Sequence, residues 1–355
     1  MKKQKLAKAV ALTAAAAMMI AMTGCSGSSA ETTAAETTAE GSTEAEAEDT
    51  AAESEETGAK AEADGTVYQI GVLQFVQHDA LDKANQGFAE ALDEAGIAYE
   101  LDQQNAAGET ATCTTIAQKF VTDGKDLIFA IATPAAQAVS AETEDIPVVL
   151  TAVTDPADSG LVESNDQPGG NVTGSSDLTP VADQIKLLKQ ILPDAKTVGV
   201  LYCSAESNSE IQAQLAHEAC EAEGLEAVDY TVATSNDIQT VVQSMVGNVD
   251  AIYAPTDNVI AAGMPTVAMV ANENQIPTSV GEEGMCNAGG LATYSIDYEE
   301  LGKVAGQMAV RILTEGEDPA TMPIEYYPSD KLKLIVNDET AEALGLTDAV
   351  AALAE

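Results

Sequence analysis

The chain has 355 residues and a formal net charge of −43, with 58 acidic residues against 15 lysines and arginines. Such an excess of negative charge repels nucleic acid and anionic lipid surfaces, so neither is expected as a partner. Arg311 is the single arginine, which disfavours an enzyme that clamps phosphate groups with arginine pairs. Two histidines and scattered cysteines are too few for an imidazole-rich metal site, and we expect no metal and no cofactor.

The first 24 residues have the order of an export signal. Four lysines in MKKQKLAK precede the apolar run ALTAAAAMMIAM, which is too short to span a bilayer comfortably as a mature helix. Gly24 and Cys25 follow, and MTGC resembles the lipobox of bacterial lipoproteins, in which the cysteine thiol is acylated. We therefore expect a signal peptide over 1–24 and lipidation of Cys25. An ordinary secretory signal with an incidental cysteine is the alternative.

The stretch after Cys25 predicts a tether. Residues 26–64 contain no aromatic residue and consist mostly of Ala, Thr, Ser, Gly and Glu. This composition buries too little apolar surface to offset the entropy of ordering, so we expect 25–65 to be a lipidated, acidic and disordered segment, with transient helix as the alternative. The folded part would then be extracytoplasmic and held at the outer face of the cell membrane by its lipid anchor alone.

From residue 66 on, apolar runs alternate with helical patterns. In the first half we expect strands at 67–75, 97–106, 126–132 and 146–153, and helices at 80–96, 110–122 and 133–142. The strands are almost continuously apolar. That pattern is typical of a parallel sheet that helices cover on both faces.

The same pattern restarts near residue 180. Here we expect helices at 180–192, 207–224, 236–245 and 258–274, and strands at 197–203, 225–232, 249–255 and 276–281. Two such halves predict an α/β fold of two Rossmann-like, doubly wound lobes with parallel sheets. In such sheets ligands bind outside the carboxyl ends of the strands, which here would face a cleft between the lobes.

Six motifs occur in an order that carries a family resemblance: GVLQFVQHDALDKANQGF, IATPAAQA, TAVTDP, NVTGSSD, YAPTDN and GGLATYSIDYEELGKVAGQMAVRIL. Together they resemble the substrate-binding lipoproteins of ABC importers in the periplasmic-binding-protein-like I superfamily, of the aromatic amino acid (tryptophan and tyrosine) type. The resemblance implies a hinge that the chain crosses several times, near 174–180 and 291–297. Lobe 1 would comprise 66–178 and about 295–320, and lobe 2 about 179–294 and about 321–355. Where the C-terminal segment docks stays open.

The resemblance also implies a function. It indicates the extracytoplasmic, monomeric solute-binding subunit of an ABC importer, which delivers an amino acid (tyrosine, tryptophan or phenylalanine) to a permease served by an ATPase. The alternatives are another small solute, namely an aliphatic amino acid, a nucleoside or a sugar, or a lipid-anchored sensor or adhesin. An enzyme on this scaffold is not expected, because the sequence has no P-loop, no G-x-G-x-x-G after a strand and no nucleophile–base pair.

The candidate ligand-binding residues share a position at the predicted carboxyl ends of strands: Phe75, His78, Thr133, Pro134, Ala135, Thr154 and Asp155 in the first half, and Ser204, Asn208, Thr256, Asp257, Asn258 and Glu282 in the second. The helix opening at Pro134 offers free N–H groups for a ligand carboxylate. An aromatic ring at Phe75 could stack on the ligand. For Thr133 an N-cap, for Asp155 an Asx turn and for Phe75 a place in the core are the alternatives.

Asp257 lies between an apolar strand and the helix that begins near Asn258. A ligand ammonium that is excluded from water needs a charged partner. Relatives in the superfamily hold an amino group with a strand-end carboxylate of the second lobe, and PTDN is the matching motif here. The resemblance therefore implies that Asp257 accepts hydrogen bonds from the ammonium, with Thr256 and Asn258 beside it. An ordinary N-cap aspartate is the alternative.

Overall fold

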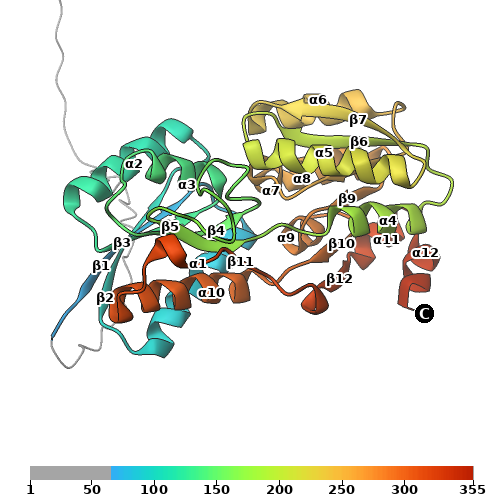
Figure 1. The fold of residues 1–355 in the computed structure, drawn as a ribbon. Helices are drawn as coiled ribbons and strands as arrows, with labels where there is room; N and C mark the ends of the chain where they lie inside the picture. Colours follow the sequence, from blue (N-terminus) through green and yellow to red (C-terminus); the bar gives the residue numbers. More distant parts are fainter. Residues whose placement is uncertain (1–64, 355) are drawn as a thin grey trace, which may run out of the picture. The chain divides into compact units, whose positions relative to one another are not determined.

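The computed structural model describes residues 65–354, all within one compact unit that spans residues 56–355. The predicted signal peptide, Cys25 and the acidic tether lie outside the described residues. The described chain forms two six-stranded sheets with helices on their faces (Figure 1). None of the helices in this part combines the length and the apolar character needed to cross a membrane.

The first lobe is built on a sheet of strand order β11-β5-β4-β3-β1-β2, in which all neighbouring strands are parallel. Its strands are β1 (Tyr68–Gln74), β2 (Tyr99–Asn105), β3 (Leu127–Ile131), β4 (Val148–Val153), β5 (Val172–Ser176) and β11 (Glu325–Tyr326). Its helices are α1 (Asp79–Ala95), α2 (Thr110–Asp123), α3 (Thr133–Ser140) and α10 (Tyr298–Val310). In Figure 1, α2 and α3 cover one face of the sheet and α1 and α10 cover the other.

The second lobe is built on a sheet of order β12-β10-β9-β8-β6-β7, in which only β12 runs antiparallel to its neighbour. Its strands are β6 (Thr197–Cys203), β7 (Glu226–Val232), β8 (Ala251–Ala254), β9 (Thr278–Val280), β10 (Ala292–Ser295) and β12 (Lys333–Val336). Its helices are α4 (Val181–Ile191), α5 (Ser207–Ala222), α6 (Ile238–Met245), α7 (Asn258–Ala262), α8 (Met264–Glu273), α9 (Glu283–Asn287), α11 (Asp338–Ala343) and α12 (Thr347–Ala351). The predicted class, two parallel-sheet α/β lobes, is confirmed.

The central strands of both sheets are buried on both faces. All five residues of β3 and all four of β8 are buried, as expected when helices cover a parallel sheet on both sides. In the first lobe, the rings of Phe88 and Phe129 stack with centroids 3.8 Å apart and planes 9° from parallel. This pair ties α1 to the middle of its sheet.

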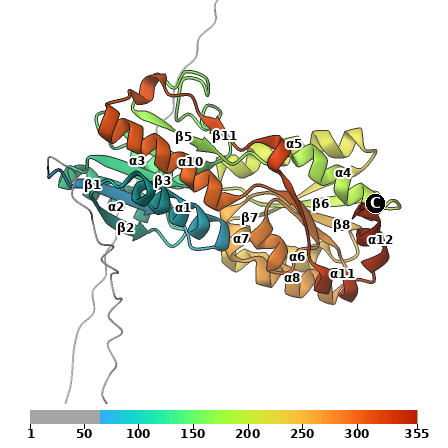
Figure 2. The same cartoon turned by 90° about the horizontal axis from the view of Figure 1, so that it is seen from below.

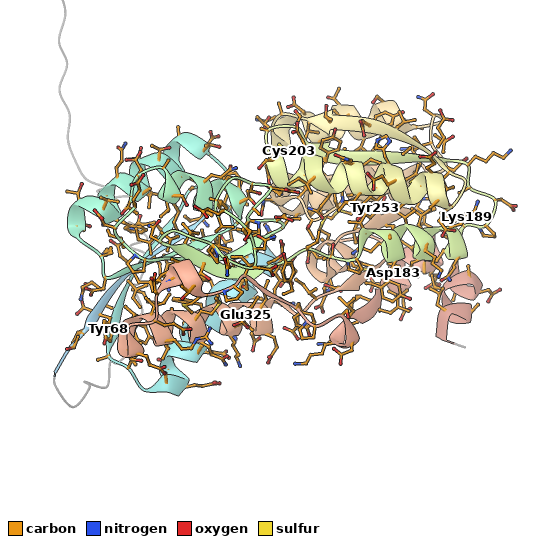
Figure 3. All side chains as sticks on the ribbon, in the orientation of Figure 1. Tyr68, Asp183, Lys189, Cys203, Tyr253 and Glu325 are labelled. Atoms are coloured by element: carbon orange, nitrogen blue, oxygen red, sulfur yellow. The ribbon has the colours of Figure 1, made fainter. Side chains whose placement is uncertain are left out.

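The core of the second lobe contains a buried polar network around Tyr253 of β8, a residue that Figure 3 labels. The Tyr253 hydroxyl donates to Gln184 Oε1 at 2.7 Å, and Gln184 Nε2 donates to the carbonyl oxygens of Gly281 (3.0 Å) and Tyr294 (2.8 Å). Buried polar groups are costly unless they find partners, and here each does. The network fixes α4 against the strand ends of β9 and β10, next to the site described below.

Within residues 65–354 the chain crosses between the sheets at three places. It passes from β5 to α4, from β10 to α10 and from β11 to β12. The C-terminal segment, which the sequence left unplaced, is divided between the sheets. Glu325–Tyr326 pair with β5 in the first sheet, and Lys333–Val336 pair with β10 in the second. The strand β11 therefore lies on the first sheet, although the expected lobe boundary near 320 assigned it to the second lobe.

A close helix contact fixes α10 on the first lobe. An added Cβ on Gly302 of α10 would lie only 2.0 Å from the carbonyl oxygen of Ala84 in α1, so a larger residue does not fit between the two backbones. Because α10 begins at Tyr298, this contact also fixes the position of that tyrosine at the hinge.

One predicted helix is wrong in its extent. The sequence predicted a single helix over 258–274, but the structure has two, α7 and α8, with Gly263 between them. Pro265 lies in the first turn of α8. A proline has no N–H to donate, and its ring clashes with the carbonyl four residues earlier, so it favours the first turn of a new helix over the interior of a continuous one.

The strand β5 was not predicted, because its sequence VTGSS is polar although all five residues are buried. Its hydroxyl groups find partners inside the fold. Thr173 Oγ1 donates to the Met322 carbonyl at 2.7 Å, and Ser175 Oγ lies 2.9 Å from Thr151 Oγ1. Because the buried side chains of this strand are mostly hydroxyl groups with hydrogen-bond partners, its sequence contains no apolar run that would predict a strand.

Candidate ligand-binding site

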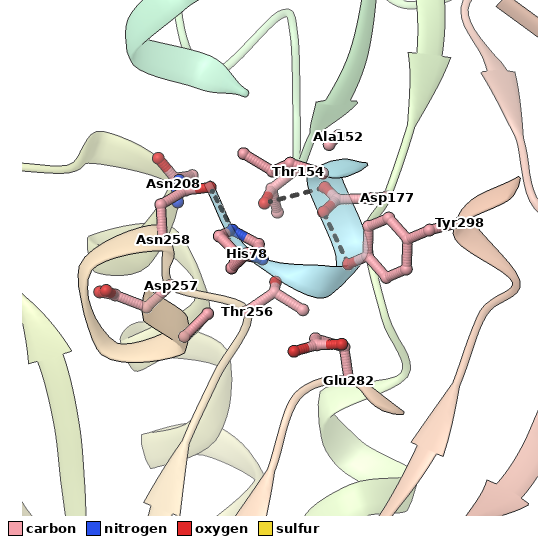
Figure 4. Close-up of a pocket in the computed structure, with 12 residues that line it drawn as sticks. His78, Ala152, Thr154, Asp177, Asn208, Thr256, Asp257, Asn258, Glu282 and Tyr298 are labelled. Carbon is pink, nitrogen blue, oxygen red and sulfur yellow. Dashed lines mark hydrogen bonds between the residues drawn. The ribbon is translucent and has the colours of Figure 1, made fainter. Parts of the chain in front are cut away.

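A cavity lies between the two lobes at the carboxyl ends of their strands (Figure 4). It holds ≈ 290 Å³ of atom-free space, part of which is open to solvent. Its lining residues are His78, Leu81, Ala152, Thr154, Asp177, Asn208, Thr256, Asp257, Asn258, Ala261, Glu282 and Tyr298.

Each wall of the cavity comes from a different part of the fold. The start of α1 and the end of β4 provide the wall of the first lobe, and the start of α5, the turn from β8 to α7 and the end of β9 provide that of the second. Asp177 follows β5 and Tyr298 begins α10, so both stand where the chain crosses between lobes. This is the placement expected for a ligand site in open α/β sheets.

Polar contacts join the lobes around the cavity. They are His78 Nε2 to Asn258 Oδ1 (3.4 Å), Gln212 Nε2 to Thr154 Oγ1 (3.3 Å), Gln137 Nε2 to Ser207 Oγ (3.3 Å) and Lys83 Nζ to Glu283 Oε2 (3.7 Å). In each pair one partner belongs to the first lobe and the other to the second. The described conformation is therefore closed across the cleft.

Asp177 is a buried carboxyl group that forms no ion pair with any residue in the described part of the chain. The Tyr298 hydroxyl donates to Asp177 Oδ2 at 3.0 Å, and Thr154 Oγ1 donates to Asp177 Oδ1 at 3.4 Å. Removal from water raises the pKa of Asp177 to about 6, because the cost of burying the charge outweighs these two hydrogen bonds.

Glu282 is a second buried carboxyl group and caps the N-terminus of α9. It accepts hydrogen bonds from the backbone N–H groups of Gly284 and Met285. Burial, with a smaller contribution from the charge of Asp79, raises the pKa of Glu282 to about 7, although the hydrogen bonds from Gly284 and Met285 and the charge of Lys83 act in the opposite direction. Figure 4 shows the carboxyl groups of Asp177 and Glu282 on either side of the Tyr298 hydroxyl, whose own pKa both acids raise.

Asp257 has donors from its own lobe on both carboxylate oxygens. Its Oδ1 accepts from the backbone N–H of Ile260 at 2.8 Å, and its Oδ2 accepts from the N–H of Cys203 (2.6 Å) and from Ser209 Oγ (2.7 Å). Burial raises the pKa of Asp257. These contacts favour the N-cap alternative that the sequence left open.

Glu206, which was not among the predicted residues, supports the wall that the second lobe contributes to the cavity. It is buried and accepts from Asn258 Nδ2 (2.5 Å) and from Asn208 Nδ2 (3.3 Å). Burial and the neighbouring Asp257 raise the pKa of Glu206 to about 8. Glu206 thus holds the two asparagine amides that face the cavity.

The structure brings seven of the predicted residues together around the cavity: His78, Thr154, Asn208, Thr256, Asp257, Asn258 and Glu282. The other six, Phe75, Thr133, Pro134, Ala135, Asp155 and Ser204, are not among its lining residues. Whether any of the thirteen contacts a ligand stays a prediction.

The six residues outside the lining have structural surroundings. Phe75 is 3% exposed and packs in the core of the first lobe. Asp155 Oδ1 accepts from the backbone N–H groups of Ala157 and Asp158, both at 3.0 Å, as in an Asx turn. Ser204 Oγ donates to the Val232 carbonyl at 3.4 Å. Pro134 and Ala135 are buried at the start of α3, and Thr133 Oγ1 there is buried without a partner among the described residues.

Five lining residues were not predicted: Leu81, Ala152, Asp177, Ala261 and Tyr298. Leu81 and Ala261 lie within the first turns of α1 and α7, beyond the strand ends that the sequence analysis considered. Asp177 lies within the hinge crossing predicted near 174–180, and Tyr298 directly follows the one predicted near 291–297. The position of the hinge was therefore the signal that could have identified them.

The model of the ABC transporter substrate-binding protein family matches residues 69–355. The chain therefore belongs to this family, whose members are the solute-binding components of ABC transporters. A curated relative, the tyrosine-binding protein of Clostridioides difficile (strain R20291), is 43% identical over 281 residues, which are 78% of this chain and 81% of the relative.

Two solved structures resemble the chain over most of its length. The ABC domain in complex with L-Trp from Streptococcus pneumonia is 38% identical, with a TM-score of 0.76 and coverage of 79% of this chain and 95% of that one. A ligand-free, open substrate-binding protein with adhesive properties from Clostridium difficile is 43% identical, with a TM-score of 0.61 and coverage of 78% and 95%. The complex superposes better despite its lower identity, in agreement with the contacts that join the lobes here.

Proposed function

We propose that this protein captures an aromatic amino acid (tyrosine, tryptophan or phenylalanine) between its two lobes and delivers it to the permease of an ABC importer. The proposal takes its ligand class from two relatives, one named a tyrosine-binding protein and the other solved with L-Trp. At 43% and 38% identity over most of the chain, both are similar enough to make their ligands the first candidates.

The cavity itself carries the proposal. Its wall combines buried carboxyl groups, which suit a ligand ammonium, with the apolar side chains of Leu81, Ala152 and Ala261 and the ring of Tyr298. An amino acid with an apolar, aromatic side chain matches both kinds of surface. Because both lobes contribute, the full set of contacts exists only when the lobes close, which is how a binding protein signals its loaded state.

The proposal includes the lipid anchor. Acylation of Cys25 would hold the protein at the outer face of the cell membrane, where the permease opens. The acidic segment 25–65 would serve as a spacer between the membrane and the folded part. We further propose that the protein acts as a monomer. The ATPase, its other partner in the importer, would contact the permease and not this protein directly.

Calorimetric titration of the purified protein tests the ligand class. Tyrosine, tryptophan and phenylalanine are compared with leucine and alanine, and with adenosine and glucose as a nucleoside and a sugar. We expect at least one aromatic amino acid to bind at least about tenfold more tightly than leucine, a difference of about 1.4 kcal/mol. Equal or tighter binding of an aliphatic amino acid, or no binding of any aromatic one, would refute the proposal.

A further inference from the structure

We propose that the ammonium group of the ligand binds between the carboxylates of Asp177 and Glu282, beside the hydroxyl of Tyr298. This inference rests on the proposed function, since it takes the ligand to be an amino acid. It assigns the ammonium to residues that differ from Asp257, the residue that the family resemblance suggested.

The charges in the cavity support this assignment. Three carboxyl groups line it, those of Asp177, Asp257 and Glu282, and none of the described lining residues is a lysine or an arginine. His78 does not supply the missing charge, because burial lowers its pKa and favours the neutral imidazole. A buried carboxylate without a partner is costly, so the cavity fits a ligand that brings a cation.

Hydrogen-bond capacity separates Asp177 and Glu282 from Asp257. A carboxylate oxygen can accept about two hydrogen bonds. Each oxygen of Asp177 and of Glu282 accepts one bond from the protein and keeps room for a second. Oδ2 of Asp257 already accepts two, from Cys203 N–H and Ser209 Oγ, so only its Oδ1, which accepts from Ile260 N–H, has room for a further donor.

The number of acceptors also fits an ammonium group, which has three N–H donors. Asp177 and Glu282 provide two acceptors. The Tyr298 oxygen provides the third, because its own proton is donated to Asp177 and its lone pairs stay available. Figure 4 shows these three groups on one side of the cavity.

A buried atom elsewhere in the lining independently points to a ligand. Asn208 is 3% exposed, and its Oδ1 has no hydrogen-bond partner among the described residues. An acceptor left unsatisfied in a buried wall costs free energy, which a ligand donor would recover. The cavity is therefore short of hydrogen-bond donors at more than one point.

The two carboxylates come from different parts of the fold. Asp177 follows β5 of the first sheet, and Glu282 follows β9 of the second. An ammonium bound by both would tie the lobes together and contribute to closure.

The test is calorimetric titration of the full-length protein, purified in detergent, with L-tyrosine. We expect Asp177→Asn and Glu282→Gln each to weaken binding at least about 30-fold, which corresponds to the lower bound for removing one partner of a buried charge pair. Asp229→Asn is the control for losing one negative charge. The Asp229 side chain is 46% exposed and pairs with His217, and neither residue lines the cavity.

A ligand analogue distinguishes ammonium binding from a structural role. We use 3-(4-hydroxyphenyl)propanoic acid, which is tyrosine without its amino group. The parent should bind this analogue at least about 30-fold more weakly than tyrosine, whereas Asp177→Asn should bind it as well as or better than the parent does. A variant that weakens both ligands equally would overturn the assignment.

The outcomes also separate this inference from the proposed function. If the parent binds none of the aromatic amino acids, the proposed function fails. If the parent binds tyrosine and both Asp177→Asn and Glu282→Gln bind it within threefold, only the ammonium assignment fails.

Discussion

Replacing Gly284 with alanine tests whether binding requires the closed arrangement of the lobes. Gly284 lies in α9 of the second lobe, and an added Cβ would lie 2.9 Å from Asp79 Cβ and 3.2 Å from Asp79 Oδ2. Asp79 is the first residue of α1 in the first lobe. The substitution therefore adds an atom where the lobes meet, so we expect it to oppose their closure.

The expected magnitude follows from the geometry. Forcing one extra methyl group into a packed contact costs about 1–3 kcal/mol, which corresponds to a 5- to 150-fold loss of affinity for tyrosine. Folding should not suffer, because Gly284 lies in a helix, where alanine is favoured over glycine by about 0.5–1 kcal/mol. Affinity and unfolding stability are thus expected to change in opposite directions.

Calorimetric titration gives the affinity, and denaturant unfolding without ligand gives the stability. The added Cβ would also lie 3.0 Å from Glu282 Oε2, so a rescue variant is needed to identify the cause. Asp79→Gly together with Gly284→Ala removes the opposing Cβ and should restore most of the affinity. An affinity within twofold of the parent, or an equal loss of stability, would refute the reasoning.

Three further predictions concern the anchor, pH and the helix contact. Cys25→Ala should move the protein from the membrane fraction to the soluble fraction, and unchanged membrane binding would contradict the lipid anchor. Burial raises the pKa of Glu282 to about 7 and that of Asp177 to about 6, and an ammonium pairs only with their ionised forms. Tyrosine affinity, measured by calorimetry, should therefore fall as the pH drops from about 8 to about 5, and a flat profile would contradict this. Gly302→Ala should lower the free energy of unfolding by about 1–3 kcal/mol or more, because the new Cβ meets a backbone oxygen that cannot turn away. An unchanged denaturation midpoint would show that α1 and α10 separate easily.

Much of the fold could be predicted because its central strands are buried on both faces. The run LIFAI in β3 has no polar position, and the strand TVGVLYC coincides with β6 at both ends. The helix predicted over 80–96 begins one residue earlier, at Asp79, and ends one residue earlier, at Ala95, with Gly96 as its C-cap. Where polar hydroxyl groups pair inside the sheet, as in β5, the hydrophobic pattern disappears and the strand was missed.

The site was only partly predictable for a related reason. The rule that ligands bind at strand carboxyl ends located His78, Asn208 and Glu282, because it depends only on the order of the elements. Which way a strand-end side chain points depends on the pleat and on its neighbours, and Phe75 turns into its own core. The sequence alone does not show which hydrogen-bond donors surround a carboxylate. It therefore could not show that Asp257 accepts three hydrogen bonds from its own lobe.

A crystal structure of the protein grown with L-tyrosine tests the central claim most directly. We predict tyrosine in the cavity between the lobes, with its nitrogen about 2.7–3.2 Å from carboxylate oxygens of both Asp177 and Glu282. Tyrosine bound outside this cavity, or a closed cavity that stays empty at saturating tyrosine, would contradict the claim.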